Sequence, residues 1–290
     1  MKVLDFGSFN LDHIYSVAEF VKPGETISSL SVETVLGGKG FNQAMAAARA
    51  GLPVYAAGNI GADGACFQEK CRENGIDPHL ITVREEATGS AIIQVNSHGE
   101  NCIILHGGAN QCVTREQVCA VLDEFAPGDV LLLQNEVNEL AFIIDEAFRR
   151  GLRIVLNPSP MNEKITVDML AKAEWIFVNE TEAERICGEK DPALCLEKLA
   201  ALCPRSRIVL TLGADGSCYK DAAVTARQKA FSVDVVDTTA AGDTFTGYFL
   251  AAYLENGDAA AALELASKAS AVAVSRKGAF NSIPFRREVI

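Results

Sequence analysis

The sequence predicts an α/β fold in which a mainly parallel sheet is covered by helices on both faces. Between residues 128 and 212, short aliphatic runs alternate with longer amphipathic segments. The aliphatic runs are VLLL at 130–133, RIVL at 153–156, WIFV at 175–178 and IVLT at 208–211, and the amphipathic segments include 138–149, 166–172 and 180–187. This alternation is typical of buried parallel strands joined by helices. VLDF at 3–6 and VYAA at 54–57 extend the same sheet.

Two segments interrupt the alternation. Residues 12–36 lack helical periodicity, and residues 89–106 read as two strands around a turn at 97–100. We expect a small antiparallel element attached to the edge of the main sheet, with ordinary surface loops as the alternative. The Ala-rich segment 240–275 breaks only near Gly257 and predicts two packed helices. Because no linker or repeat divides the sequence, residues 1–290 are expected to form one domain.

Composition and charge exclude several classes of protein. The chain has 26 Lys and Arg residues against 38 Asp and Glu residues, a formal net charge of −12. It therefore offers no basic surface for nucleic acid or anionic lipid. No apolar run approaches the roughly 18 residues of a membrane span, and the nine cysteines lack zinc-site spacing. We expect a cytoplasmic protein with reduced thiols and no nucleic-acid or membrane partner.

The strongest local signal is DTTAAGDTFTG at 237–247, where a β-type run meets the start of a helix. Such a turn directs backbone N–H groups outward, toward phosphate oxygens or the negative charge of a transition state. Gly242 permits a ligand to approach the backbone closely. Asp243 is either a general base or a first-turn acid that the helix dipole stabilises, and this segment alone leaves both readings open.

A second glycine-rich segment, GGKGFNQA at 37–44, precedes an Ala-rich helix. Its glycines allow the backbone to pass close to a ligand, and Lys39 and Asn42 are suited to hydroxyl groups or phosphate. It matches neither the P-loop nor the dinucleotide-binding fingerprint. A plain turn is the alternative.

Polar residues follow the predicted strands at one edge of the sheet. Asn10 and Asp12, in GSFNLD at 7–12, project from one side of an extended segment, unless they form an Asx turn. Other strands are followed by Glu136, Asn157, Asn179, Glu180, Glu182 and the TLGADG turn at 211–216. Because open α/β sheets bind ligands at the carboxyl ends of their strands, these residues predict a ligand crevice.

Together these motifs resemble the ribokinase-like (PfkB) sugar kinases, the family that also contains fructokinases, adenosine kinases and minor phosphofructokinases. The resemblance covers nearly the whole chain, in family order. It rests on GSFNLD at 7–12, GGKGFNQA at 37–44, GNIGADG at 58–64, NPSP at 157–160, NETE at 179–182, TLGADG at 211–216, DTTAAGDTFTG at 237–247 and SRKGAFNSIP at 275–284. It implies a three-layer α/β/α sandwich with a small β lid formed by about 12–36 and 89–106.

The resemblance also assigns roles to single residues. Asp243 would take the proton from a primary hydroxyl, and the backbone at Ala240, Ala241 and Gly242 would form the anion hole for the γ-phosphoryl group of ATP. The sugar would be bound by Asn10, Asp12, Gly38, Lys39, Asn42, Glu136 and Asp243. Nucleotide contacts would come from Asn179, Thr211, Gly213, Gly216, Gly242 and Ser267. Ser267 stands where many ribokinases place Asn or His, and Gln134-Asn135-Glu136-Val137 replaces the commoner Gln-Leu-Glu pattern.

Two kinds of cation are implied by the same resemblance. Mg²⁺ would lie near Asn179 and Glu182 through water. A monovalent cation, K⁺, would lie beside the anion hole, at the positions that match family ligands: Asp237, Thr239, Ala273, Arg276, Gly278 and Ser282. In ribokinases the lid also pairs between subunits, so the resemblance implies a homodimer.

The expected activity is ATP-dependent phosphorylation of a sugar CH₂OH, with ribose converted to ribose 5-phosphate. Another pentose, a ketohexose or a nucleoside is the alternative substrate. A non-catalytic sugar- or nucleotide-binding regulator on the same fold is the alternative class, and the intact Asp243 argues against it. A Rossmann oxidoreductase would require a glycine fingerprint after the first strand, where the chain has Gly7-Ser8-Phe9-Asn10.

Overall fold

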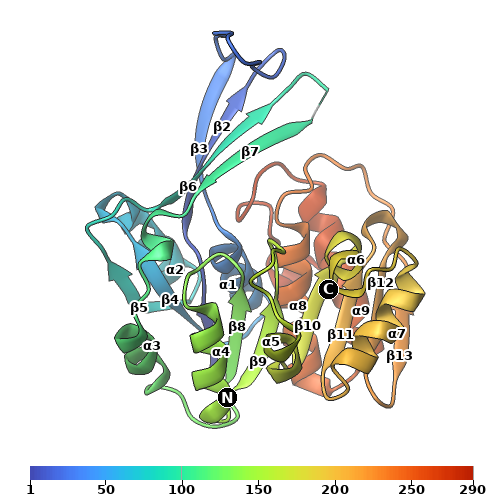
Figure 1. Cartoon of the computed structure of the whole chain (residues 1–290). Helices are drawn as coiled ribbons and strands as arrows, with labels where there is room; N and C mark the ends of the chain where they lie inside the picture. Colours follow the sequence, from blue (N-terminus) through green and yellow to red (C-terminus); the bar gives the residue numbers. More distant parts are fainter. Residues whose placement is uncertain (99, 290) are drawn as a thin grey trace.

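The computed structural model describes residues 1–98 and 100–289, whose strands form two sheets (Figure 1). The larger one, the main sheet, has nine strands in these residues. From one edge to the other they are β13 (Thr225–Gln228), β12 (Ser217–Lys220), β11 (Arg207–Thr211), β10 (Trp175–Asn179), β9 (Arg153–Asn157), β8 (Val130–Gln134), β1 (Val3–Phe6), β4 (Val54–Ile60) and β5 (Asp77–Val83). Pairing is parallel from β11 to β5 and antiparallel for β12 and β13.

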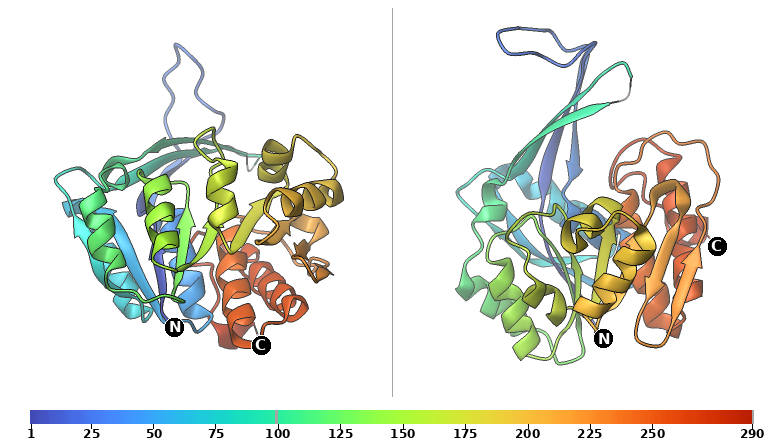
Figure 2. Two further views of the ribbon diagram at one scale, coloured as in Figure 1. Left: turned by 60° about the horizontal axis from the view of Figure 1, so that its bottom comes forward. Right: turned by 45° about the vertical axis from the view of Figure 1, so that its right-hand side comes forward.

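Helices cover both faces of the main sheet, and the predicted three-layer α/β/α fold is confirmed (Figure 2). One layer contains α1 (Lys39–Arg49), α2 (Ala65–Glu73), α8 (Ala241–Asn256) and α9 (Ala259–Val274). The other contains α3 (Arg115–Leu122), α4 (Leu140–Arg149), α5 (Val167–Lys172), α6 (Glu180–Cys187) and α7 (Pro192–Leu202). Short 3₁₀ turns occur at Ala62–Gly64, Gly108–Gln111, Gly213–Asp215 and Arg286–Glu288.

The aliphatic strands feed two separate cores because successive side chains of a strand point to opposite faces. In β8, Val130 and Leu132 pack on the face of α1 and α8, while Leu131 and Leu133 pack on the face of α4. The Ala-rich segment forms two helices as predicted. Gly257 ends α8 in the left-handed conformation, with φ 70°, and Asp258 caps α9 by accepting from the backbone N–H of Ala260.

The second sheet, here called the small sheet, corrects two expectations. Its order is β3 (Ser31–Gly37), β2 (Asn10–Ser16), β6 (Gly89–Val95) and β7 (Asn101–His106). The sheet is not antiparallel throughout, because its two hairpins join through a parallel β2–β6 pair. It does not extend an edge of the main sheet either, because β2 continues from β1, an interior strand. Alternating polarity marks strands but does not encode which strands pair.

The small sheet rises from the side of the molecule where the parallel strands end (Figure 1). Just below it, α1 begins directly against the connection between β1 and β2, and Phe41 N donates to Ser8 O at 3.0 Å. Glycine is required at Gly40, since a Cβ there would overlap the backbone of Gly7 and Ser8. This close approach brings GSFNLD and GGKGFNQA together at one point.

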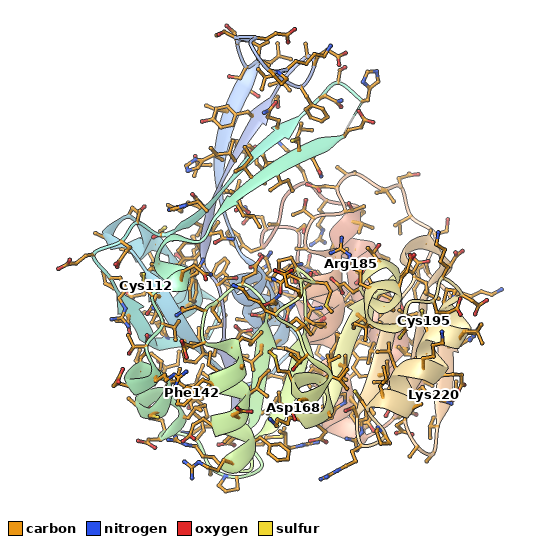
Figure 3. All side chains as sticks on the ribbon, viewed as in Figure 1. Cys112, Phe142, Asp168, Arg185, Cys195 and Lys220 are labelled. Carbon is orange, nitrogen blue, oxygen red and sulfur yellow. The ribbon has the colours of Figure 1, made fainter. Side chains whose placement is uncertain are left out.

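None of the helices that the structure describes is long and apolar enough to span a membrane. All nine cysteines are free thiols in the described chain. Cys112 and Cys195, both labelled in Figure 3, lie in separate parts of the molecule.

Candidate active site

The Asp243 carboxylate lies at the junction of two helices, in the first turn of α8 and against the start of α1. Its Oδ1 accepts from Gln43 Nε2 at 2.9 Å, and its Oδ2 accepts from Asn42 Nδ2 at 3.2 Å. The residue is 7% exposed and lines a cavity of about 60 Å³, here called the central cavity. Other lining residues include Lys39, Asn157, Asn179, Glu182, Thr211 and Gly242. The carboxylate is therefore held by amides beside a cavity, as a proton acceptor requires.

The turn that leads into α8 leaves backbone donors available beside this carboxylate. Ala240 adopts φ 60°, a left-handed conformation that is uncommon for a residue with a Cβ. Gly242 is open, with no atom within 4 Å of where a Cβ would lie. In the described residues, the N–H groups of Gly242 and Asp243 have no backbone acceptor. The turn thus has the free donors and the helix dipole that suit an anion.

Lys39 supplies the positive side chain of the central cavity. Its backbone N–H donates to Glu136 Oε2 at 2.9 Å. Within the described chain, its ammonium forms no ion pair shorter than 4.0 Å. Burial alone would lower the pKa of Lys39, but the charges of Asp243, Glu136 and Glu182 outweigh burial and raise it. The side chain therefore stays cationic at neutral pH.

A cluster of polar side chains borders this site beneath the small sheet. Glu136 accepts the Ser8 hydroxyl and the Lys39 N–H, and Asn10 and Glu136 both line a larger cavity of about 540 Å³. Burial and the neighbouring Glu136 raise the pKa of Asp12 to about 7. Asn42 Oδ1 is buried without a partner among the described residues, and an acceptor of this kind favours a hydroxyl donor.

The predicted sugar residues lie close together around this cluster. Gly38 packs against the Ser8–Asn10 backbone, and the amide of Asn42 bonds to Asp243. These residues lie at the start of β2, α1 and α8 and just after β8, and they form one group: Asn10, Asp12, Gly38, Lys39, Asn42, Glu136 and Asp243.

The predicted nucleotide residues are only partly brought together. Asn179 and Thr211 are register partners at the ends of β10 and β11, and both line the central cavity with Gly242. Gly213 and Gly216 lie in the turn that follows β11. Ser267 lies buried on α9 and lines neither of the two cavities described above.

Asn179 and Glu182 form the capping box of α6. Glu182 N donates to Asn179 Oδ1 at 2.9 Å, and Asn179 N donates to Glu182 Oε2 at 3.0 Å. Each side chain thereby satisfies one helix N–H. Glu182 still contributes to the wall of the central cavity, with its other carboxylate oxygen outside the capping box.

The predicted monovalent-cation residues lie on the loop before α8 and the segment after α9. Asp237 accepts from Thr239 N at 2.9 Å and from Gly278 N at 2.9 Å, which joins these two segments. Arg276 N donates to Ala273 O, and the Ser282 hydroxyl donates to Ala279 O. In the part of the chain that the structure describes, no group of three or more His, Cys, Asp or Glu side chains is arranged to hold a metal ion.

Sequence reasoning missed several residues that build the site. Gln43 Nε2 bridges Asp243 and Asn157, and Asn110 donates to Asn10 Oδ1 at 2.8 Å. Gln43 belongs to the glycine-rich motif and follows Lys39 by four positions, so helical spacing places both on one face of α1. That spacing was the available signal. Asn110 lies in the short turn after β7 and carries no such spacing signal.

Comparison with known proteins places this geometry in a family. The model of the pfkB family carbohydrate kinases matches residues 2–286. Ribokinase of Haemophilus influenzae is 38% identical over 295 residues, which cover 98% of this chain and 95% of that protein. Ribokinase of Bacillus subtilis is 33% identical over 290 residues, with 98% and 96% covered.

Solved structures agree with these relatives. A ribokinase structure from Thermotoga maritima superposes with a TM-score of 0.89 at 30% identity, covering 99% of this chain and 97% of that one. A ribokinase from Arabidopsis thaliana, solved with ribose and ATP, gives a TM-score of 0.88 at 29% identity with the same coverage.

The fold and the site define a kinase that phosphorylates small alcohols. The chain belongs to the pfkB family of carbohydrate kinases. The predicted resemblance is therefore confirmed, and so is the predicted phosphotransferase activity toward an alcohol group.

The raised pKa of Asp12 makes stability depend on pH. A carboxyl group whose pKa rises from 3.8 in the unfolded chain to about 7 in the folded one loses stabilisation as pH rises through that interval. We expect Asp12→Asn to have the higher melting temperature at pH 8, by roughly 2–6 °C. At pH 4 the parent and Asp12→Asn should have the same melting temperature.

Thermal melts of both proteins between pH 4 and pH 8 measure this difference. The control is Glu19→Gln, which changes an exposed carboxylate near the end of the same strand. A pH-independent difference between Asp12→Asn and the parent would contradict the prediction.

Proposed function

We propose that this protein is an ATP-dependent ribokinase that transfers the γ-phosphoryl group of ATP to the primary hydroxyl of ribose, giving ribose 5-phosphate. The observation that carries this proposal is the position of Asp243, between the proposed sugar residues of β2 and α1 and the backbone donors of α8. The names of the relatives support it, including the Arabidopsis ribokinase solved with ribose and ATP.

In this mechanism, the buried carboxylate of Asp243 accepts the proton of the attacking hydroxyl. Asn42 and Gln43 hold that carboxylate still, so that no rearrangement is needed when the proton transfers. The backbone at Ala240, Ala241 and Gly242 forms the anion hole for the γ-phosphoryl group. Ala241 N donates to Thr238 O at 3.2 Å, so the stabilising donors in this turn are the free N–H groups of Gly242 and of the next residue, Asp243. Phosphoryl transfer depends mainly on such positioning and charge stabilisation.

Lys39 joins the two halves of the site. Its side chain contributes to the wall of the central cavity beside Asp243, where its charge balances the phosphate oxygens. Sugar hydroxyls donate to Asp12 and to the unpaired Asn42 Oδ1, and they accept from Asn10. Thr211, Gly213 and Gly216 lie where the nucleotide would approach from β11, and we extend this contact to Ser267 on α9.

Mg²⁺ accompanies ATP in this proposal. The residues fit this ion, since Asn179 and Glu182 offer oxygen donors and each keeps its capping bond, which leaves room for coordination through water. When bound, Mg²⁺ neutralises charge on the phosphate oxygens.

K⁺ is proposed at the loop between Asp237 and Gly278. The donor set fits a monovalent cation, because it combines backbone carbonyls with a carboxylate already fixed by Thr239 and Gly278. The remaining candidate positions are Ala273, Arg276 and Ser282. A cation there would favour the conformation of the adjoining anion hole.

The small sheet is proposed to act as the lid. It carries Asn10 and Asp12 on β2, and its strands rise from the side of the molecule where the parallel strands end (Figure 1). Closure over the sugar would exclude water and so limit hydrolysis of ATP. In this proposal residues 1–290 act as one domain whose lid comes from about 12–36 and 89–106.

The substrate is tested by measuring ADP release with ribose, other pentoses, ketohexoses and nucleosides, with and without K⁺. We expect ribose to give the highest kcat/KM, and K⁺ to increase it. A higher kcat/KM for a nucleoside or a ketohexose would contradict ribose as the substrate, and equal rates in Na⁺ and K⁺ would contradict the K⁺ site.

Asp243→Asn removes the proposed base and keeps the shape of the side chain. We expect kcat to fall by at least about 10²-fold, with little change in the affinity for ATP or sugar. Steady-state kinetics and calorimetric titration measure the two effects. Asp234→Asn, in the exposed loop before α8, serves as the control. Near-normal turnover in Asp243→Asn would remove Asp243 from its role.

A homodimer through the small sheet is proposed from its exposed apolar side chains. Val32, Ile104 and Leu105 are 59%, 62% and 55% exposed, and side chains project from both faces of the sheet (Figure 3). Apolar surface gathered on one thin sheet favours association with another copy.

Ile104→Lys places a charge in this surface, and we expect it to shift the dimer toward monomer. Light scattering over a range of protein concentrations measures the mass. Leu194→Lys, at a comparably exposed leucine on α7, should remain dimeric. A monomeric parent protein, or equal masses for both variants, would contradict an interface at the small sheet.

A further inference from the structure

A chain of buried polar side chains runs from Asp243 into the main sheet. Gln43 Nε2 donates to Asp243 Oδ1 at 2.9 Å, and Gln43 Oε1 accepts from Gln134 Nε2 at 2.8 Å. Gln134 Nε2 also donates to Asp5 Oδ2 at 3.1 Å. The chain therefore links α8, α1, β8 and β1 in sequence. The proposed mechanism gives no part to Asp5 or Gln134.

Asp5 is an unusual residue for its position. It lies in the middle of an interior strand and is 2% exposed, and Gln134 and Gln43 are each 1% exposed. No cation balances it among the described residues. The groups that face it are Gln134 on β8, the Asp243 carboxylate on α8 and the Cys71 thiol on α2. Burial raises the pKa of Asp5 well above its ordinary range, and the charge of Asp243 adds to this effect.

The hydrogen-bonding balance of Gln134 indicates where a proton on Asp5 would lie. Gln134 Oε1 is buried and has no partner among the described residues. A Cβ at Gly7 would overlap both Asp5 Oδ1 and Gln134 Oε1, so these two oxygens face the same small space. Two bare acceptors side by side are unfavourable, whereas an O–H on one of them satisfies both.

We propose that Asp5 is a neutral carboxylic acid that pairs with the side-chain amide of Gln134 through two hydrogen bonds, and that this pair positions the catalytic base Asp243 through Gln43. In the pair, Asp5 Oδ1–H donates to Gln134 Oε1 while Gln134 Nε2–H donates to Asp5 Oδ2. The positioning part rests on the proposed function of Asp243, and the pairing part does not.

The pair fixes the orientation of each amide in turn. With one N–H on Asp5, Gln134 has its second N–H available for Gln43 Oε1. Gln43 then presents its own two N–H groups to Asp243 Oδ1 and Asn157 Oδ1, at 2.9 and 3.1 Å. Rotating Gln43 by 180° would place its carbonyl oxygen against these acceptors. The acid at Asp5 thus selects the one arrangement that donates to Asp243.

Two substitutions at Asp5 separate this proposal from a merely structural role. Asn presents an N–H where the neutral acid presents its O–H, so Asp5→Asn should keep kcat within about twofold of the parent. Leu has a similar size but offers no partner to Gln134. We expect Asp5→Leu to lower kcat by roughly 10- to 10²-fold while the KM values for sugar and ATP change by less than about threefold.

The control for lost packing is Leu4→Val, on the same strand but in the core of the opposite face. It should lower the melting temperature and leave kcat unchanged. Equal loss of kcat in Asp5→Asn and Asp5→Leu would overturn the neutral acid, and normal kcat in Asp5→Leu would overturn the positioning role.

Infrared spectroscopy tests the pair without an activity assay, and it applies even where Asp5→Leu does not fold. The difference spectrum between the parent and Asp5→Asn at pH 8.5 should contain the C=O stretch of a protonated carboxylic acid, shifted in D₂O. Its absence would overturn the pair. A parent protein that phosphorylates no sugar would instead refute the role of Asp243, with the infrared band unaffected.

Discussion

The site depends on two hydrogen bonds that join the first helix of the chain to the eighth. Asn42 and Gln43 reach the Asp243 carboxylate across 201 and 200 positions of sequence. These bonds form because α1 and α8 approach closely, with Gly247 of α8 directly against Ala46 and Ala47 of α1. The proposed hydroxyl-binding and phosphate-binding parts of the site thus meet at one packed helix pair. Any change that separates the two helices would separate Asp243, the proposed base, from the side chains of α1 that hold it.

The close packing of α1 and α8 also brings several charged side chains together at the site. The charges of Asp243, Glu136 and Glu182 act on the half-buried Lys39, and burial raises the pKa of both Asp12 and Glu136. A protein of net charge −12 binds an anionic nucleotide only if its charges are arranged locally. Lys39 and the N-terminus of α8 provide that local arrangement. The carboxylates then accept hydrogen bonds from hydroxyl groups or bind protons, whereas they repel phosphate.

Most of the main sheet could be predicted from the sequence, because each buried strand is marked by its own short aliphatic run. Aliphatic runs such as VLLL and WIFV became β8 and β10, and the break at Gly257 separated α8 from α9. The small sheet was placed wrongly, since the parallel pairing of β2 with β6 is a tertiary contact between segments about 80 residues apart. The proposed sugar residues were located from motifs. Their supports, Gln43 and Asn110, were not, because the bonds they make depend on how helices and loops pack.

Asp5 shows how a local conflict in a sequence can mark a site. In VLDF, it is the one charged residue within a strand whose other members are apolar and fully buried. A carboxylate in such an apolar strand lowers the stability of the fold, because an unpaired buried carboxylate is strongly unfavourable. The structure relieves part of this cost, because Gln134 Nε2 donates to Asp5, while Gln134 Oε1 has no partner among the described residues. Gln134 Oε1 also gains a partner only if Asp5 carries a proton. In the proposed pair, that proton makes the burial of Asp5 tolerable and also fixes the orientation of Gln134 and Gln43.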